Sequence, residues 1–182
     1  MYEVIIEINF CILLQTGDPI KIIGIGDFGA SNSTGDTLKT FALGSCVAVI
    51  ISHKSTGTIG MVHVALPDSS ISRTGKAKTK PGYFADTGIP TLLKHMRSMG
   101  CVGPVSKSQF SVKIAGGASV LSCSDIFQIG RKNVYAIKNI LDSYGLNPIA
   151  ADIGGNISRT VSIVIGSEKI SVTSPAREEW KL

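Results

Sequence analysis

Two apolar runs separated by a short polar break stand out in the middle of the chain. Positions 47–51 and 59–66 are almost wholly apolar, and the break at 52–57 is polar and ends in a glycine. Continuous apolar runs of about four to eight residues between polar turn residues are typical of buried strands. The pattern therefore predicts two neighbouring strands, both largely buried, joined by a short loop.

Helical periodicity predicts two helices, at 89–99 and 131–144, because their apolar residues recur at helical spacing. In the first, Pro90 suits the first turn, and Asp86 or Thr87 is the expected N-cap. A glycine follows each helix and is the expected stop signal. Each helix therefore has one apolar face with which to cover a sheet.

The rest of the chain alternates between further strand patterns and loop compositions. Positions 30–36 and 68–81 are rich in small and polar residues and predict surface loops. The second follows the 59–66 run, which makes it a candidate rim for a site there. Strands are expected at 21–25, 111–115, 147–152, 160–165 and 169–173, the last two as a hairpin. Strands that are apolar on both faces, interleaved with two amphipathic helices, indicate a layered α/β fold with a mixed sheet.

Length and composition favour a single domain. The chain has 182 residues, of which 43% are hydrophobic, enough for one sizeable core. Residues 1–19 are expected to form an N-terminal extension, in whose first ten residues apolar and polar positions alternate as in a strand. The segment is either an extra edge strand or an upstream extension produced by the choice of start codon. The domain proper is expected to span 20–173, and residues 174–182 are expected to form a loosely attached tail.

The charged residues give no indication of nucleic-acid binding. Lys and Arg outnumber Asp and Glu by 18 to 13, for a net charge of +5, but the basic residues are scattered along the chain. Aromatic residues make up only 6% of the chain and offer no platform for stacked bases. A mildly basic surface suits an acidic protein partner, and solubility alone explains it equally well.

The cysteines and the N-terminus indicate a reduced, cytoplasmic protein. The first fifteen residues lack a basic start and are interrupted by acidic residues, so neither a signal peptide nor a membrane span is expected. No C-x-x-C pair occurs, which argues against a zinc site. Cys101 and Cys123 are expected to be structural. The four cysteines are Cys11, Cys46, Cys101 and Cys123.

Positions 24–29, G-I-G-D-F-G, formally match the dinucleotide-binding pattern G-x-G-x-x-G. That pattern needs a helix immediately after it and an acidic residue about twenty positions on. The sequence continues instead with a loop composition and then an apolar run. A dinucleotide cofactor is therefore not expected.

Cys46 and His63 are the candidate chemical groups. A thiol becomes an effective nucleophile when an adjacent base takes its proton, and a cysteine and a histidine on neighbouring strands can supply that pair. Gly44, just before Cys46, permits a sharp turn that leaves backbone N–H groups free to face an oxyanion. The alternative is that both residues are structural, because free cysteines and hydrogen-bonded histidines are common in cores.

Spacing alone does not bring the two groups together. A simple hairpin centred near Ser55 pairs His63 with Val49, so the bend at 44–45 must swing the thiol round. The two other histidines, His53 and His95, lie among polar or basic residues. They are expected to be solvated or partly covered rather than ligands.

Five blocks of sequence combine these residues into a specific pattern. The first two contain the candidate groups: T-F-A-L-G-S-C at 40–46 and G-M-V-H-V-A-L-P at 60–67. The other three are K-I-A-G-G-A at 113–118, I-G-R-K-N at 129–133 and D-I-G-G-N-I-S-R at 152–159. In these blocks, and in their order, the chain resembles the CheD family, the chemoreceptor glutamine deamidases of bacterial and archaeal chemotaxis.

The resemblance implies an α/β/α sandwich around a mixed sheet and a protein-glutamine deamidase. Cys46 would be the nucleophile, His63 the base and Thr40 the third group that helps to hold the histidine, with Gly44 and Ser45 supporting the turn or the oxyanion. Chemoreceptor cytoplasmic domains would be the substrate and a CheC-type phosphatase a further partner, with no metal or organic cofactor. The alternative is a non-catalytic regulatory protein that binds receptors or that phosphatase. Cysteine proteases and transglutaminases share the thioester chemistry and are a second alternative.

Overall fold

A computed structural model describes residues 19–72, 75–119, 128–167 and 169–182. The predicted N-terminal extension, except for residue 19, lies outside the described residues, as do Cys11 and Cys123. Within the described residues, no helix is long and apolar enough to cross a membrane.

The strands form two five-stranded sheets, both mixed in direction. In the order in which they pair, sheet A contains β1 (Ile20–Ile22), β3 (Thr37–Leu43), β8 (Arg159–Val164), β9 (Ile170–Ser174) and β10 (Arg177–Lys181). Sheet B contains β2 (Phe28–Ser31), β5 (Ile59–Val64), β4 (Val47–His53), β6 (Phe110–Gly116) and β7 (Pro148–Ile153). Only β1 with β3 and β6 with β7 pair in parallel; the other pairs are antiparallel.

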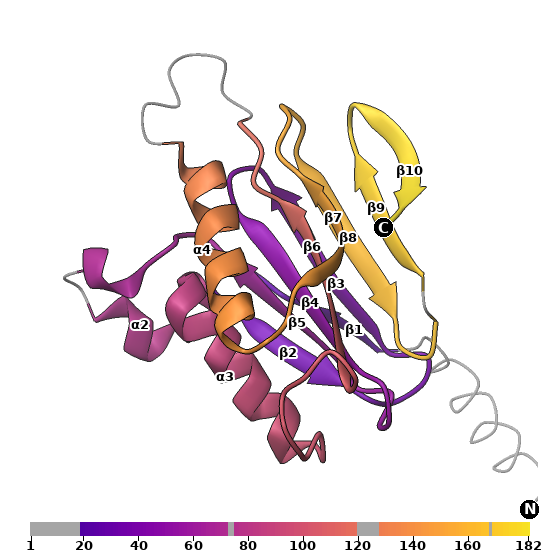
Figure 1. Ribbon diagram of the computed structural model, residues 1–182. Coiled ribbons are helices and arrows are strands. Elements are labelled where there is room, and N and C mark those ends of the chain that lie inside the picture. The colour runs from indigo at the N-terminus through magenta and orange to yellow at the C-terminus, as the bar shows by residue number, and fades with distance from the viewer. Residues whose placement is uncertain (1–18, 73–74, 120–127, 168) are drawn as a thin grey trace, which may run out of the picture.

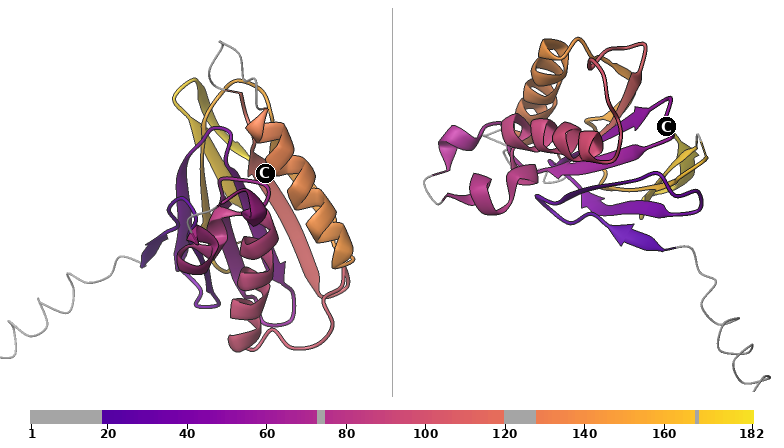
Figure 2. Two further views of the ribbon diagram at one scale, coloured as in Figure 1. Left: turned by 90° about the vertical axis from the view of Figure 1, so that its left-hand side faces the viewer. Right: turned by 90° about the horizontal axis from the view of Figure 1, so that it is seen from below.

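Sheet B is the central layer, with helices on one face and sheet A on the other (Figures 1 and 2). The two long helices, α3 (Ala85–Ser98) and α4 (Ile129–Ser143), pack against each other and cover the same face. The predicted single α/β domain with mixed strand directions is confirmed. The order of layers differs from the predicted α/β/α sandwich, because a second sheet, not helices, covers the other face of sheet B.

Two apolar cores separate these layers, and alternate residues of β4 contribute to each. Val47, Val49 and Ile51 face the helices, whereas Ala48 and Ile50 face sheet A. Side chains of successive strand residues point to opposite faces, so a central strand covered on both faces is apolar throughout. The prediction of two neighbouring, buried strands is therefore confirmed for β4 and β5.

The pairing of β4 with β5 differs by one residue from the simple hairpin expected from the sequence. His63 pairs with Ala48, and Val49 pairs with Val62. The loop closes on the bond from His53 N to Thr58 O, with Gly57 at φ +65°. Because a slip of one residue exchanges the faces of a strand, this register decides on which side the imidazole lies.

Helix α3 begins earlier than predicted, at Ala85, and Pro90 lies inside it. Neither expected cap residue caps it. The Asp86 carboxylate accepts from the amide and the hydroxyl of Ser69, and the Thr87 hydroxyl donates to Pro81 O. Both side chains therefore fix the preceding segment against the helix. Three short helical segments occupy that segment: η1 (Ser69–Ile71), α2 (Lys76–Thr79) and η2 (Pro81–Tyr83).

Two other predictions were wrong. Positions 30–36 are not all loop, because β2 includes residues 30 and 31. The tail is not loosely attached: β10 pairs with β9, and Trp180 donates a hydrogen bond to Asp152 at 2.8 Å. Short polar strands of this kind lack the apolar alternation that marks a strand in a sequence.

Candidate active site

Cys46 lies in the turn that leads from β3 into β4, and its side chain is partly buried against the core between the sheets. All three backbone carbonyls of the turn accept hydrogen bonds: Gly44 O from Ala118 N at 2.7 Å, Ser45 O from Asn133 Nδ2 at 2.9 Å, and Cys46 O from Gly117 N at 2.8 Å. The backbone N–H groups of Ser45 and Cys46 donate to no other residue in the described part of the chain. The turn is therefore held through its carbonyls, which leaves these two N–H groups available to an oxyanion.

Gly116 allows the turn to lie this close to β6. Its φ is +118°, and a Cβ at this position would lie 2.2 Å from Cys46 O. Such a contact is far shorter than any van der Waals separation, so a side chain here would displace the backbone beside the thiol. The glycines of the 113–118 block thus serve the placement of Cys46.

An ion pair between the buried Arg159 and the partly buried Asp152 also supports the turn. Arg159, 5% exposed, donates to the Asp152 carboxylate at 2.9 Å and to Gly154 O at 3.0 Å. Gly154 N in turn donates to Gly116 O at 2.9 Å. The 152–159 block therefore fixes the loop against which the Cys46 turn rests.

Two groups, the Thr40 hydroxyl and the Ile23 carbonyl, hold His63 in one tautomer. Thr40 Oγ1 lies 2.8 Å from His63 Nδ1 and 2.7 Å from Ile23 O. A carbonyl can only accept, so the single hydroxyl proton of Thr40 goes to Ile23, and the hydroxyl oxygen accepts from Nδ1–H. The proton on Nδ1 leaves Nε2 unprotonated and able to act as a base.

The register of sheet B puts Cys46 and His63 on the same face. His63 pairs with Ala48, two residues beyond Cys46, so both side chains point towards sheet A. His63 Nε2 is buried and has no hydrogen-bond partner among the described residues, Cys46 included. The two groups are therefore diagonal neighbours that are not yet hydrogen-bonded, an arrangement common in free enzymes, where such bonds tighten when substrate binds.

Burial keeps both groups neutral near pH 7. It lowers the pKa of His63 to about 4, although the Ile23 carbonyl and the charge of Asp27 partly oppose the shift. Burial raises the pKa of the Cys46 thiol, partly opposed by the backbone of Cys46 itself. The resting pair is thus a thiol and a neutral imidazole, not a thiolate and an imidazolium, and an unprotonated imidazole is the form suited to general-base catalysis.

The neutral pair predicts the pH dependence of Cys46 alkylation. Because the thiolate is the reacting form, the rate with iodoacetamide is expected to rise about tenfold per pH unit above neutrality. No plateau is expected up to pH 9.0, the usual pKa of a thiol. Peptide mass spectrometry after timed labelling would report Cys46 separately from the buried Cys101. A plateau near pH 6 or 7 would instead indicate a preformed thiolate and contradict this assignment.

The structure brings together Thr40, Cys46 and His63 and places Gly44 and Ser45 in the supporting turn. Sequence reasoning missed two contributors, the carbonyl of Ile23 and the side chain of Asn133. A backbone carbonyl leaves no trace in a sequence. Asn133 belongs to the 129–133 block, but its contact with a turn 88 residues earlier follows only from the fold.

His53 is not the solvated or partly covered residue predicted from the sequence. It is 2% exposed, lies 2.8 Å from Thr56 Oγ1 and packs on the Phe110 ring. Thr56 Oγ1 also contacts Cys101 Sγ at 3.4 Å. These residues lie at the opposite end of β4 from Cys46 and form part of the core, in line with the structural role predicted for Cys101.

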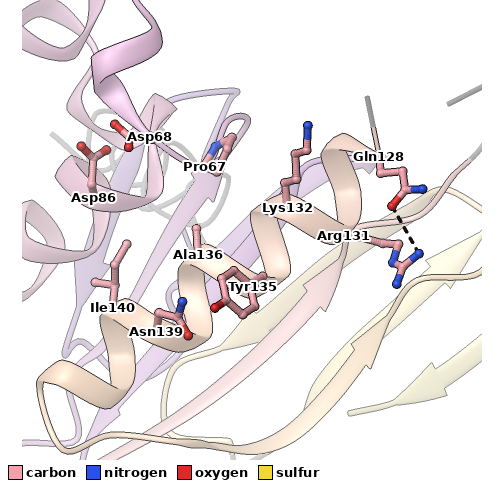
Figure 3. Close-up of a pocket in the computed structure, with 10 residues that line it drawn as sticks. All are labelled: Pro67, Asp68, Asp86, Gln128, Arg131, Lys132, Tyr135, Ala136, Asn139 and Ile140. Atoms are coloured by element: carbon pink, nitrogen blue, oxygen red, sulfur yellow. Dashed lines mark hydrogen bonds between the residues drawn. The ribbon is translucent and has the colours of Figure 1, made fainter. Parts of the chain in front are cut away.

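A cavity of about 650 Å³ lies on the outer side of α4, and neither Cys46 nor His63 lines it (Figure 3). It lies between the outer side of α4 and the residues that follow β5. Arg131, Lys132 and the largely exposed Tyr135 line its helical side, and Asp68 and Asp86 lie opposite (Figure 3). The described residues contain no cluster of three or more His, Cys, Asp or Glu side chains suited to holding a metal ion.

The fold and site together define a layered α/β domain with a thiol and a neutral imidazole on adjacent strands, the pair used in cysteine-dependent acyl transfer. A family model described as CheD chemotactic sensory transduction matches residues 65–174. The chain belongs to the CheD family.

Several curated relatives are similar over most of their length. "Probable chemoreceptor glutamine deamidase CheD" of Syntrophotalea carbinolica is 44% identical over 161 residues, covering 88% of this chain and 98% of the relative. "Chemoreceptor glutamine deamidase CheD" of Thermotoga maritima is 38% identical over 152 residues, covering 84% and 90%. A solved structure, the Neisseria meningitidis protein NMB0706, aligns with a TM-score of 0.41 at 10% identity, over 81% of this chain and 67% of that one.

Proposed function

We propose that the protein is a protein-glutamine deamidase that converts specific glutamines of chemoreceptors, the methyl-accepting chemotaxis proteins, to glutamate in chemotaxis adaptation. The observation that carries the proposal is the pair of hydrogen bonds that links Ile23 O, the Thr40 hydroxyl and His63 Nδ1. It leaves Nε2 unprotonated on the same face as the Cys46 thiol. Membership of the CheD family and the names of the relatives support the choice of substrate.

The first half of the reaction forms a thioester. His63 Nε2 takes the thiol proton as Cys46 Sγ attacks the carboxamide carbon of the glutamine. The N–H groups of Ser45 and Cys46 face the oxyanion of the tetrahedral intermediate. His63 then gives the proton to the departing nitrogen, the C–N bond breaks, and ammonia leaves.

Water completes the reaction. His63 Nε2 takes a proton from a water molecule, whose oxygen attacks the thioester carbon. The C–S bond breaks, the proton returns to Cys46 Sγ, and the product is glutamate, which has lost its acid proton to solvent. Each step uses only groups of the protein and water.

The proposal includes the setting of the reaction. The catalytic domain is assigned to residues 20–173, and the protein is assigned to the cytoplasm, where receptor signalling domains lie. A net charge of +5 suits an acidic protein partner. A CheC-type phosphatase is assigned as a second binding partner.

The test is conversion of a chemoreceptor cytoplasmic fragment by the purified protein. Ammonia release should match, mole for mole, the glutamines that become glutamate, measured by peptide mass spectrometry. A receptor fragment whose modified glutamines are replaced by asparagine is the substrate control, because the shorter side chain places the carboxamide out of reach. Tight binding without conversion would contradict the deamidase and support the regulatory alternative.

Replacing Thr40 with valine tests whether the Thr40 hydroxyl fixes the tautomer of His63. Valine has nearly the same shape but no hydroxyl, so Nδ1 loses its acceptor and the proton can move to Nε2. The rate is expected to fall about 10- to 100-fold, a fraction of what general-base catalysis contributes. Thr40→Ser should restore much of the rate because it returns the hydroxyl. A valine variant with normal activity would show that Thr40 does not fix the imidazole.

A further inference from the structure

The ladder between β4 and β5 includes His63, which pairs with Ala48, but it ends before Cys46. Val47 with Val64 is the last pair in the ladder between β4 and β5 at this end. Beyond it, the N–H groups of Ala65 and Leu66 both donate to Tyr83 O at 3.0 Å, so β5 turns away towards η2. Backbone pairing therefore does not fix the Cys46 turn against the end of β5.

The side chain of Asn133 spans this gap. Its Nδ2 donates to Ser45 O at 2.9 Å, beside the thiol, and to Ala65 O at 2.9 Å, two residues beyond His63. An amide nitrogen carries two hydrogens, and both are used. Because carbonyl oxygens only accept, this network also fixes the orientation of the amide. One planar group thus sets the separation and angle between the two strands.

Packing does not explain a polar residue at this position. Asn133 is completely buried, on the inner face of α4 beside Ile137 and Leu141. Its Oδ1 is buried and has no partner among the described residues. An unpaired buried acceptor costs about 1–3 kcal/mol, so an apolar side chain would suit the helix better. The amide instead supplies the two hydrogen bonds that join Ser45 to Ala65.

We propose that Asn133 is a positioning residue that holds the Cys46 thiol and the His63 imidazole at the separation needed for proton transfer. It touches neither reacting atom and acts through Ser45 and Ala65. Displacements of about 1 Å can reduce a rate 100-fold when reacting groups must be aligned. The inference rests on the proposed function. The positioning residue lies on α4, the helix that borders the cavity of Figure 3.

Asn133→Asp is the decisive variant. Aspartate has the same shape, but its carboxylate accepts and cannot donate to either carbonyl. We expect kcat for the receptor fragment to fall about 100-fold with KM changed less than about threefold. We also expect alkylation of Cys46 at neutral pH to become faster, because the freed turn exposes the thiol. Asn147→Asp, an exposed site just beyond α4, makes the same chemical change and should alter neither quantity.

The two measurements separate positioning from loss of the fold. Slower turnover with faster labelling of Cys46, while Cys101 stays protected, supports the positioning role of Asn133. Labelling of Cys101 at the same rate as Cys46 would show general unfolding and overturn it, as would unchanged turnover or unchanged Cys46 labelling. If the wild-type protein converts no glutamine, the proposed function fails. Cys46 and Cys101 labelling of the variant then decides the inference alone, and unchanged Cys46 labelling overturns it.

Discussion

Cys46→Ala is expected to abolish conversion of receptor glutamine, lowering the rate at least about 10⁴-fold, because the thioester cannot form without the thiol. The remaining groups of the site, an imidazole and two backbone N–H groups, would leave only slow direct attack by water. Peptide mass spectrometry of the receptor fragment over a long incubation is the measurement. The variant should still fold, because a partly exposed thiol contributes little to the core.

Two companion variants make the result specific. Cys46→Ser should be almost as inactive, because a hydroxyl is a weaker nucleophile with a far higher pKa, yet it preserves the shape of the turn. Cys101→Ala removes the buried cysteine at the other end of β4 and should leave turnover intact. An alanine variant at position 46 that still releases ammonia would mean that another group attacks the carboxamide.

His63→Gln is expected to lower the rate about 10³-fold, within the range that a general base contributes. Glutamine retains a side-chain amide near Thr40 but has no group that takes a proton from the thiol. The measurement is the initial rate of ammonia release at neutral pH. His95→Gln, on the partly exposed face of α3, is the matched control and should keep full activity. Equal loss in both variants would remove His63 from the mechanism.

The same substitution also changes the response to acid. The pKa of His63 is about 4 in the folded protein and 6.5 when unperturbed. Between these values the unfolded chain binds a proton that the folded protein does not, so stability falls as pH falls from 6.5 to 4. The shift corresponds to about 3 kcal/mol. Denaturant unfolding at pH 7 and at pH 4.5 should show a smaller acid loss for His63→Gln; an unchanged loss would contradict the burial of a neutral imidazole.

The strands that form the centre of the domain could be predicted because their patterns are strong. Both apolar runs are covered on two faces, and only residues in such a position are apolar without alternation. The register of their pairing could not be predicted. It depends on the loop between them, where the bond from His53 N to Thr58 O closes the hairpin one residue away from the symmetric pairing.

Weakly patterned strands were missed for a related reason. β2 is short and rich in small residues, and β10 is mostly charged. β2 is stabilised by pairing with β5 and β10 by pairing with β9. The composition of a segment does not show such pairing. The same holds for the layers: two amphipathic helices predict a covered sheet, but not that both cover one face.

The sequence and the family resemblance together named Cys46, His63 and Thr40 as the candidate site, whereas two of the contacts that orient these groups could not be predicted. Cys46 and His63 are residue types that suggest catalysis wherever they occur together. The carbonyl of Ile23 accepts the Thr40 proton and so fixes the tautomer of His63. Asn133 supports the Cys46 turn, but the sequence predicted only that it lies in a helix that covers the sheet. Such contacts depend on which segments the fold brings together and have no local pattern.

The order of the contributing segments along the chain has a consequence during synthesis. Cys46 and His63 leave the ribosome early, but the contacts that hold them come from residues made much later: Gly117, Asn133 and β8, the strand that pairs with β3 beside Thr40. A nascent chain that ends before residue 159 therefore carries the thiol and the imidazole without their alignment. The arrangement of the thiol and the imidazole is therefore complete only after β8 has been made and has paired with β3.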